Sequence, residues 1–182
     1  MRRQFKVVFV AVGIVAAIIA SFASAAPDPG AHQRSAEVFF LDPDPTDCAT
    51  IEALVGAFDT AKGEHSEAFI SLFVDDPCTG TSASGTAQET VQPDAFDVEK
   101  SLMSARLATT LTLPDGAVPV TIDVVWTKDP KPHCARPKID LGIDIRFGKL
   151  CNATASGTVT VNDVTYSLGP AGGTIVRGQP PP

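Results

Sequence analysis

The stretch SLMSARLATTLTLPDGAVPVTIDVVWTK, residues 101–128, decides the fold class. Apolar residues alternate with mostly polar ones on both sides of the segment PDGA, which is typical of a β-hairpin with one buried face. Both apolar sets face one core only if Leu111 pairs with Val120 and Leu107 with Val124, because a shift of one residue would turn one set outward. We therefore predict two antiparallel strands joined by a four-residue loop.

The residues of the loop agree with this register. Pro114 presets φ at the second turn position, and Gly116 accepts a positive φ near the exit. The same pairing places Trp126 opposite Ala105, with its side chain toward the core. Trp126 is therefore predicted to be a core residue.

Residues 1–25 have the three parts of a secretory signal peptide. A basic segment is followed by an uncharged apolar run, Val7 to Ala20, and by the small residues Ala23-Ser24-Ala25. An apolar run of this length is short for a bilayer-spanning helix, so we expect cleavage after Ala25. The pair Arg2-Arg3 also resembles a twin-arginine signal, but the strongly hydrophobic run favours the general secretory route.

Cleavage would leave enough chain for a single domain with its own core. We predict a flexible lead-in at 26–35, an antiparallel β-sandwich or flattened barrel of about nine or ten strands at 36–178, and a disordered tail at 179–182. The leader contains three basic residues and no acid, so its loss moves the net charge from -7 to -10. Such a charge repels nucleic acid and anionic lipid, so neither is expected as a partner.

All four cysteines follow the leader, and export makes disulfides chemically available, with three possible connectivities. The apolar runs 48–59 and 66–75 flank a polar segment. If the turn between them centres on Gly63, an antiparallel hairpin brings Cys48 and Cys78 face to face. A second bridge, Cys134–Cys151, would tie a proline-rich connection to the end of the strand that follows it.

Helical spacing is an alternative for residues 50–61, where Ile51, Leu54, Val55 and Phe58 would share one helix face. The placement of the cysteines favours the strand. The clearest alternation in the chain runs from Ile139 to Phe147 and predicts a half-buried strand. The remaining predictions are strands at 36–41, 156–161, 164–168 and 173–176, an edge strand or loop at 79–88, and a continuing or bent strand at 94–100.

Acidic residues are the first candidates for a site. Asp42, Asp44 and Asp47 in one loop, with Asp75 and Asp76 after a strand, could supply oxygen ligands to Ca²⁺. The spacing lacks the glycine and the closing glutamate of an EF-hand, so a solvated loop is the simpler interpretation. No cofactor is otherwise expected.

Asp123, Asp140 and Asp144 are predicted on solvent faces of strands, where a hydrolase or lyase could use a carboxylate pair. The histidines His32, His65 and His133 belong to no catalytic motif or zinc-ligand spacing. The two residues that could stack on a sugar, Trp126 and Tyr166, occupy inward-facing strand positions, so core packing explains them better. We assign no catalytic, cofactor-binding or metal residues, and only Cys48, Cys78, Cys134 and Cys151 have a predicted role, in disulfides.

Three short motifs, SARL with TT at 104–110, VVWT at 124–127 and ASGTV at 155–159, resemble a pattern in uncharacterised, secreted, β-rich bacterial proteins. This resemblance implies a β-rich exported domain and no particular activity, ligand or site residue.

The sequence therefore favours a non-enzymatic extracellular or cell-surface binding or structural module over an enzyme. The alternatives are a secreted hydrolase or lyase with acidic residues on a sheet face, and a calcium-stabilised envelope domain. The partner would be an unknown extracellular ligand or surface component. We expect secretion, or a periplasmic location if the source has an outer membrane, and no transmembrane segment once the signal peptide is removed.

Overall fold

The structure, a computed structural model, describes residues 34–41, 48–59, 65–135, 138–140, 144–146 and 149–178. The predictions for the signal peptide, for most of the lead-in and for the tail lie outside these residues. Within this part of the chain, no helix is long and apolar enough to cross a membrane.

The described residues form β-strands and one short 3₁₀ helix. The elements are β1 (Arg34–Leu41), β2 (Thr50–Asp59), β3 (Ser66–Asp76), β4 (Thr81–Val91), β5 (Phe96–Val98), β6 (Ser104–Leu113), η1 (Asp115–Ala117), β7 (Val118–Lys128), β8 (Cys134–Ala135), β9 (Lys138–Asp140), β10 (Asp144–Arg146), β11 (Lys149–Val161) and β12 (Val164–Arg177).

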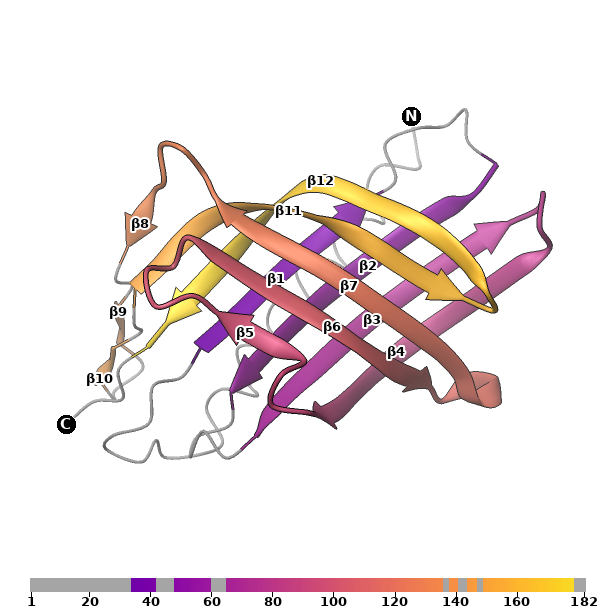
Figure 1. Ribbon diagram of the computed structural model, residues 1–182, viewed down its shortest axis with the longest axis horizontal. Coiled ribbons are helices and arrows are strands. Elements are labelled where there is room, and N and C mark those ends of the chain that lie inside the picture. Colours follow the sequence, from indigo (N-terminus) through magenta and orange to yellow (C-terminus); the bar gives the residue numbers. More distant parts are fainter. Residues whose placement is uncertain are drawn as a thin grey trace.

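One antiparallel sheet of ten strands contains almost all of the fold. Its order is β4-β3-β2-β1-β12-β11-β7-β6-β5, with β8 added to β11, while β9 and β10 form a separate pair. The strands β1–β4 cross behind β6, β7 and β11, so the sheet curls into a nearly closed barrel around its core (Figure 1). The predicted all-β fold class is confirmed.

The hairpin formed by β6 and β7 has the predicted register. Leu111 pairs with Val120, Leu107 with Val124 and Ala105 with Trp126. The loop contains η1 and has φ of -66° at Pro114 and 80° at Gly116. Because the apolar positions of both strands are buried, the period-two pattern was sufficient to fix this pairing.

Trp126 links the two walls of the barrel across the core. Its side chain is fully buried, and its Nε1 donates a hydrogen bond to the carbonyl oxygen of Glu37 on β1 at 3.0 Å. The indole lies against Gly173 of β12, where an added Cβ would be 3.0 Å from Trp126 Cδ1 and 2.6 Å from that carbonyl oxygen. Glycine at this position therefore allows the indole to reach β1.

The segment with helical spacing is strand β2, so the helical alternative is wrong. It pairs with β3 from Thr50 opposite Asp75 to Asp59 opposite Ser66. This register is symmetric about the bond between residues 62 and 63 rather than about Gly63, one residue away from the predicted pairing. The disulfide Cys48–Cys78 still forms just beyond the ladder, with a Cα–Cα distance of 5.8 Å.

The second predicted disulfide is also confirmed. Cys134 of β8 lies directly opposite Cys151 of β11, with their Cα atoms 4.1 Å apart. β11 then turns into β12 through Asn162 and Asp163, both with positive φ, as expected for a tight hairpin turn.

The predicted continuous strand from Ile139 to Phe147 is wrong. β9 and β10 pair antiparallel with Ile145 opposite Ile139, so the chain reverses direction between them. The sequence has Gly142 midway between the paired residues, and glycine weakens the interior of a strand. Alternation continues on both sides of such a reversal, so the pattern alone did not reveal it.

Two smaller predictions also need correction. The segment 94–100 contains only the short strand β5, which pairs antiparallel with β6 instead of continuing into it. The two strands predicted at 164–168 and 173–176 are one strand, β12, which pairs with β11 across a register shift between Ala155 and Gly157. By contrast, 79–88 contributes to β4, which is an edge strand as one prediction proposed.

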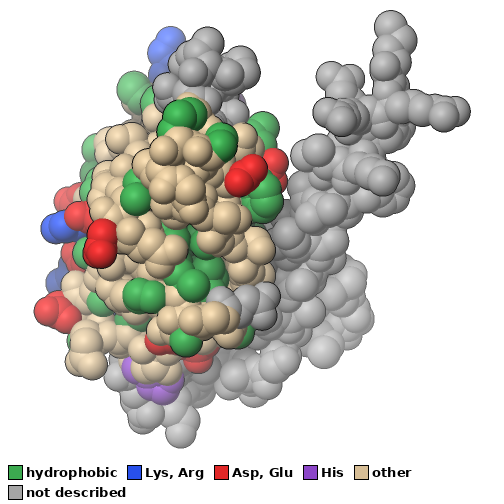
Figure 2. All heavy atoms as spheres, turned by 90° about the vertical axis from the view of Figure 1, so that its right-hand side faces the viewer, with side chains coloured by type: hydrophobic (Ala, Val, Ile, Leu, Met, Phe, Trp, Pro, Cys, Tyr) green, Lys and Arg blue, Asp and Glu red, His purple; other side chains and the backbone are tan. Residues whose placement is uncertain are grey.

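The barrel closes between β4 and the end of β6 by side-chain contacts. The Thr112 N–H donates to Glu89 Oε1 at 2.6 Å, and Gly85 of β4 lies close to Leu113. At the end of the barrel on the right of Figure 1, apolar and uncharged side chains occupy the middle and charged ones lie toward the margins (Figure 2).

Candidate binding surface

Large apolar side chains gather on the outer side of β1, β2 and β3. Alternate residues of these strands enter the core, and the others face outward. The outward set includes two exposed phenylalanines and one exposed leucine, which are Phe39 (43% exposed), Leu41 (53%) and Phe73 (44%). Together with the half-buried Leu54 and Phe69 they make up the surface that we call the outer apolar face.

The ladder register makes these residues neighbours. Phe39 of β1 pairs with Leu54 of β2, and in the next outward row Leu41 pairs with Glu52, which pairs with Phe73 of β3. Side chains paired across neighbouring strands have Cβ atoms about 5 Å apart. The exposed apolar groups therefore lie in two neighbouring rows of one surface, with Glu52 between Leu41 and Phe73, instead of being scattered over the barrel.

A glycine shapes the middle of the face. Gly56 of β2 pairs with Phe69 of β3, and a Cβ at Gly56 would lie 2.5 Å from Phe69 Cζ. The ring of Phe69 therefore lies over the glycine and extends toward β1. This arrangement, an aromatic ring covering a cross-strand glycine, replaces the missing side chain with apolar contact.

Glu37 of β1 is also opposite Gly56, on the same outward row. Burial raises the pKa of its carboxyl group above the ordinary value, and a hydrogen bond with Thr174 of β12 partly opposes that rise. The Glu37 carboxyl group therefore lies beside an apolar surface. Because the local dielectric there is low, its ionised form would attract an approaching cation strongly.

The surface around the outer apolar face is acidic. Outward positions of β1–β3 contain Glu37, Glu52, Glu67 and Asp75, whereas the only Lys or Arg in β1–β4 is Arg34. Arg34 is engaged at the barrel end by Asp59 at 2.6 Å and by Asp97 at 3.4 Å. In the sequence, residues 34–99 include 14 acidic and two basic residues, whereas residues 100–178 include six acidic and nine basic residues.

The outer side of the other barrel wall is more polar. Its large exposed apolar residues, Met103 and Val125, are not neighbours in the ladder. Arg106 and Asp123 form an ion pair at 2.9 Å, and Thr110 and Thr121 hydrogen-bond at 2.9 Å. Exposed apolar residues that occur singly are normal, so the cluster on β1–β3 is the distinctive feature.

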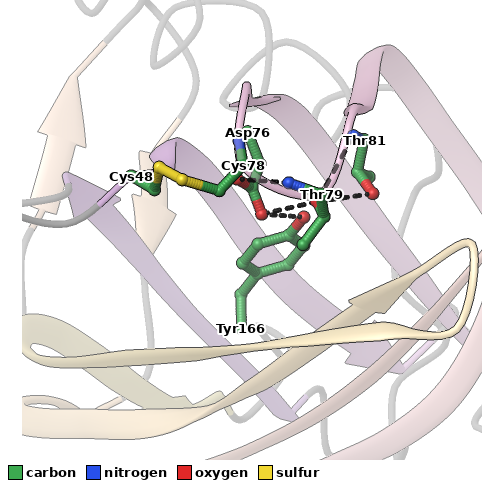
Figure 3. The surroundings of a disulfide bond; sticks show 6 residues. All are labelled: Cys48, Asp76, Cys78, Thr79, Thr81 and Tyr166. Carbon is green, nitrogen blue, oxygen red and sulfur yellow. Dashed lines mark hydrogen bonds between the residues drawn. A yellow bond between two sulfur atoms is a disulfide. The ribbon is translucent and has the colours of Figure 1, made fainter.

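The corner at the Cys48–Cys78 disulfide contains a buried carboxylate with a structural role (Figure 3). Asp76 Oδ1 accepts hydrogen bonds from the N–H groups of Cys78 and Thr79, and Oδ2 accepts from Thr79 Oγ1 at 2.7 Å and from Tyr166 Oη at 3.1 Å. These hydrogen bonds, first that of the Thr79 hydroxyl, lower the pKa of Asp76. Asp76 therefore fastens the β3–β4 turn to β12.

This corner offers little for a metal ion. Ligand atoms of Cys48, Asp76 and Cys78 lie within 4.8 Å of one another, but both sulfurs belong to the disulfide. A bridged sulfur lacks the thiolate that binds metals. Both oxygens of Asp76 already accept hydrogen bonds, and Asp75 is exposed.

The predicted calcium loop with Asp42, Asp44 and Asp47 lies outside the described residues. The calcium hypothesis for that loop stays a prediction.

The acids of the hydrolase hypothesis do not share one sheet. Asp123 is on the outer side of β7, and Arg106 binds it through both carboxylate oxygens. Asp140 and Asp144 pair with each other in the separate β9–β10 ladder.

The remaining candidates are spread over the chain. His133 and His65 are both exposed, the first before β8 and the second before β3, and His32 lies outside the described residues. Trp126 and Tyr166 are buried, as predicted for core residues, and Tyr166 holds Asp76.

The outer apolar face was not predicted from the sequence. A signal for it exists in β3, where Ala68, Ile70, Leu72 and Val74 take one face and Phe69 and Phe73 take the other. A strand with large apolar residues on both faces is buried on both sides or presents one apolar face to a partner. The alternation in the sequence predicts only that this segment is a strand.

A scan of protein-family models finds no match to this chain, and neither does a search of curated proteins. Among solved structures, the chain is similar to a Nitrosomonas europaea protein provisionally described as AttH, at 8% identity and a TM-score of 0.37. The match covers 83% of this chain and 52% of the other, so this chain spans about half the length of that protein. Such a TM-score is too low to support an argument about fold or function.

Proposed function

We propose that this protein is a secreted, non-enzymatic binding module that attaches to an extracellular or cell-surface component through the outer apolar face. The observation that carries the proposal is that Phe39 and Leu41 of β1 and Phe73 of β3 are exposed on the same outer side of the sheet, with only β2 between them. Exposed apolar surface is unfavourable in water, and contiguous patches of it mark interaction sites.

The two disulfides support the extracellular part of this proposal. Such bridges persist in oxidising compartments such as the periplasm or the extracellular medium and are rare in the cytosol. A leader with the pattern of residues 1–25 would deliver the chain there. A bridged, barrel-like scaffold is rigid, which keeps a binding surface on its exterior preorganised.

The proposal is tested by co-sedimentation of the exported, purified protein with the cell envelope of the organism that produces it. Wild type and the control variant Val125→Ser should bind saturably, and the double variant Phe39→Ser/Phe73→Ser should bind at least about tenfold more weakly, because central aromatic residues dominate most interfaces. Equal binding by all three proteins, or no saturable binding by wild type, would refute the proposal.

A further inference from the structure

The exposed part of the outer apolar face has the size of a peptide-binding surface. Phe39, Leu41 and Phe73 together expose on the order of 300 Å² of side chain, given that each aromatic residue can bury about 200 Å². A standard interface between folded proteins needs about 800 Å² from each partner. The face alone is therefore too small for a stable dimer and large enough for one short segment.

The spacing of the face also suits a helix. Leu41 and Phe73 are separated by one intervening strand, because both pair with Glu52 of β2. Strands lie about 4.8 Å apart, so these side chains are about 10 Å apart, close to the diameter of an α-helix with its side chains. A helix lying across β1–β3 could contact both with one apolar stripe.

The charges around the face define the partner further. Glu52 lies between Leu41 and Phe73, Glu37 lies beside Phe69, and the outward positions of β1–β4 contain no Lys or Arg. A segment that packs here meets carboxylates within and beside its footprint. Basic side chains next to the apolar stripe would pair with them, and acidic ones would be repelled.

We propose that the outer apolar face binds a cationic amphipathic segment of a partner protein, with apolar side chains on Phe39, Leu41 and Phe73 and with Lys or Arg beside Glu37 and Glu52. This inference rests on the proposed binding function and names the chemistry of its partner. A second copy of the chain would bring the same acids face to face, and an anionic lipid surface would be repelled by them.

The test uses the exported, purified protein and three synthetic peptides of about 14 residues, long enough for the helix-in-groove mode of recognition. One peptide is an amphipathic helix of Leu and Lys, the second replaces Lys with Glu, and the third scrambles the first. Titration calorimetry gives the affinity of each for wild type. The protein variants are Phe39→Ser/Phe73→Ser and Glu52→Gln, with Val125→Ser and Asp163→Asn as controls that make the same kinds of change elsewhere.

The Leu/Lys helix should bind wild type, and the Leu/Glu and scrambled peptides should bind at least about tenfold more weakly. Phe39→Ser/Phe73→Ser should weaken the Leu/Lys helix at least about tenfold, Glu52→Gln about threefold, and each control less than about twofold. Added salt should weaken binding, because the paired charges are partly exposed. Far-UV circular dichroism checks that each variant is folded, and Phe39→Ser alone replaces the double variant if that one is not.

Equal binding of the Leu/Lys and Leu/Glu helices, or unchanged binding by Phe39→Ser/Phe73→Ser, would overturn the inference. The inference would also be overturned if sedimentation showed that wild type forms dimers and Phe39→Ser/Phe73→Ser does not, or if wild type bound phosphatidylglycerol vesicles more tightly than the Leu/Lys peptide. If the peptides fail but envelope binding still depends on Phe39 and Phe73, the chemistry of the partner is wrong and the proposed function stands. If envelope binding is also independent of them, both are wrong.

Discussion

Replacing Trp126 with phenylalanine tests how the two walls of the barrel are held together. The side chain is fully buried, and its N–H donates to the Glu37 carbonyl oxygen at 3.0 Å. Losing this hydrogen bond should cost about 1.5 kcal/mol. The smaller ring leaves about 40 Å³ unfilled, which at about 24 cal/mol per Å³ adds about 1 kcal/mol.

The expected loss is therefore about 2.5 kcal/mol in the free energy of unfolding, or roughly 5–10 °C in Tm for a domain of this size. The assay is urea unfolding followed by far-UV circular dichroism, because the variant lacks the only tryptophan. Val125→Ala changes the neighbouring, outward-facing residue and should alter stability by less than about 0.5 kcal/mol. If Trp126→Phe unfolds within that same margin of wild type, the contact across the core does not stabilise the barrel.

Three other changes test separate features of the fold by urea unfolding. Gly157→Ala should destabilise the protein strongly, because the new Cβ would overlap the carbonyl oxygen of Asp123. The control Gly172→Ala has open space around its Cβ and should not destabilise the protein, so equal effects of the two substitutions would refute the close contact at Gly157. Tyr166→Phe removes a hydrogen-bond donor to Asp76. The pKa of Asp76 is lower in the folded protein than the unfolded value of about 3.9, so the ionised carboxylate stabilises the fold above that value, and this stability is lost as pH falls through the folded pKa. The variant should thus be less stable than wild type at pH 7 and differ less at pH 2, and a pH-independent difference would contradict this. Glu37→Gln should stabilise the fold at pH 7 and not below about pH 4. Burial raises the folded pKa of Glu37, so the wild-type protein loses stability as pH rises through that pKa and the variant does not. A variant less stable than wild type at pH 7 would contradict this.

The β6–β7 hairpin was predictable because two local signals agree in it. Its apolar residues occupy one face only, and the loop PDGA has residues that suit a turn. The Cys48–Cys78 disulfide was predictable for a related reason, since strand pairing limits which cysteines can meet. In both cases the information lies within one pair of neighbouring strands.

The outer apolar face and the Trp126 contact were not predicted, for different reasons. Trp126 and Glu37 are 89 residues apart, and their contact follows from the closure of the whole barrel. In β1, the run Val38-Phe39-Phe40 is apolar on both faces, so alternation does not say which face is inside. Only the curl of the sheet places Phe40 in the core and Phe39 outside.

Hydroxyl-radical footprinting of the protein, free and bound to its envelope component, tests the central claim most directly. Mass spectrometry reports how fast each exposed side chain is oxidised in the two states. We predict that binding protects Phe39, Leu41 and Phe73 and leaves Met103 and Val125, which are similarly exposed on the other wall, unchanged. Protection of Met103 and Val125 with no change at Phe39, Leu41 and Phe73 would contradict the claim that the outer apolar face is the binding surface.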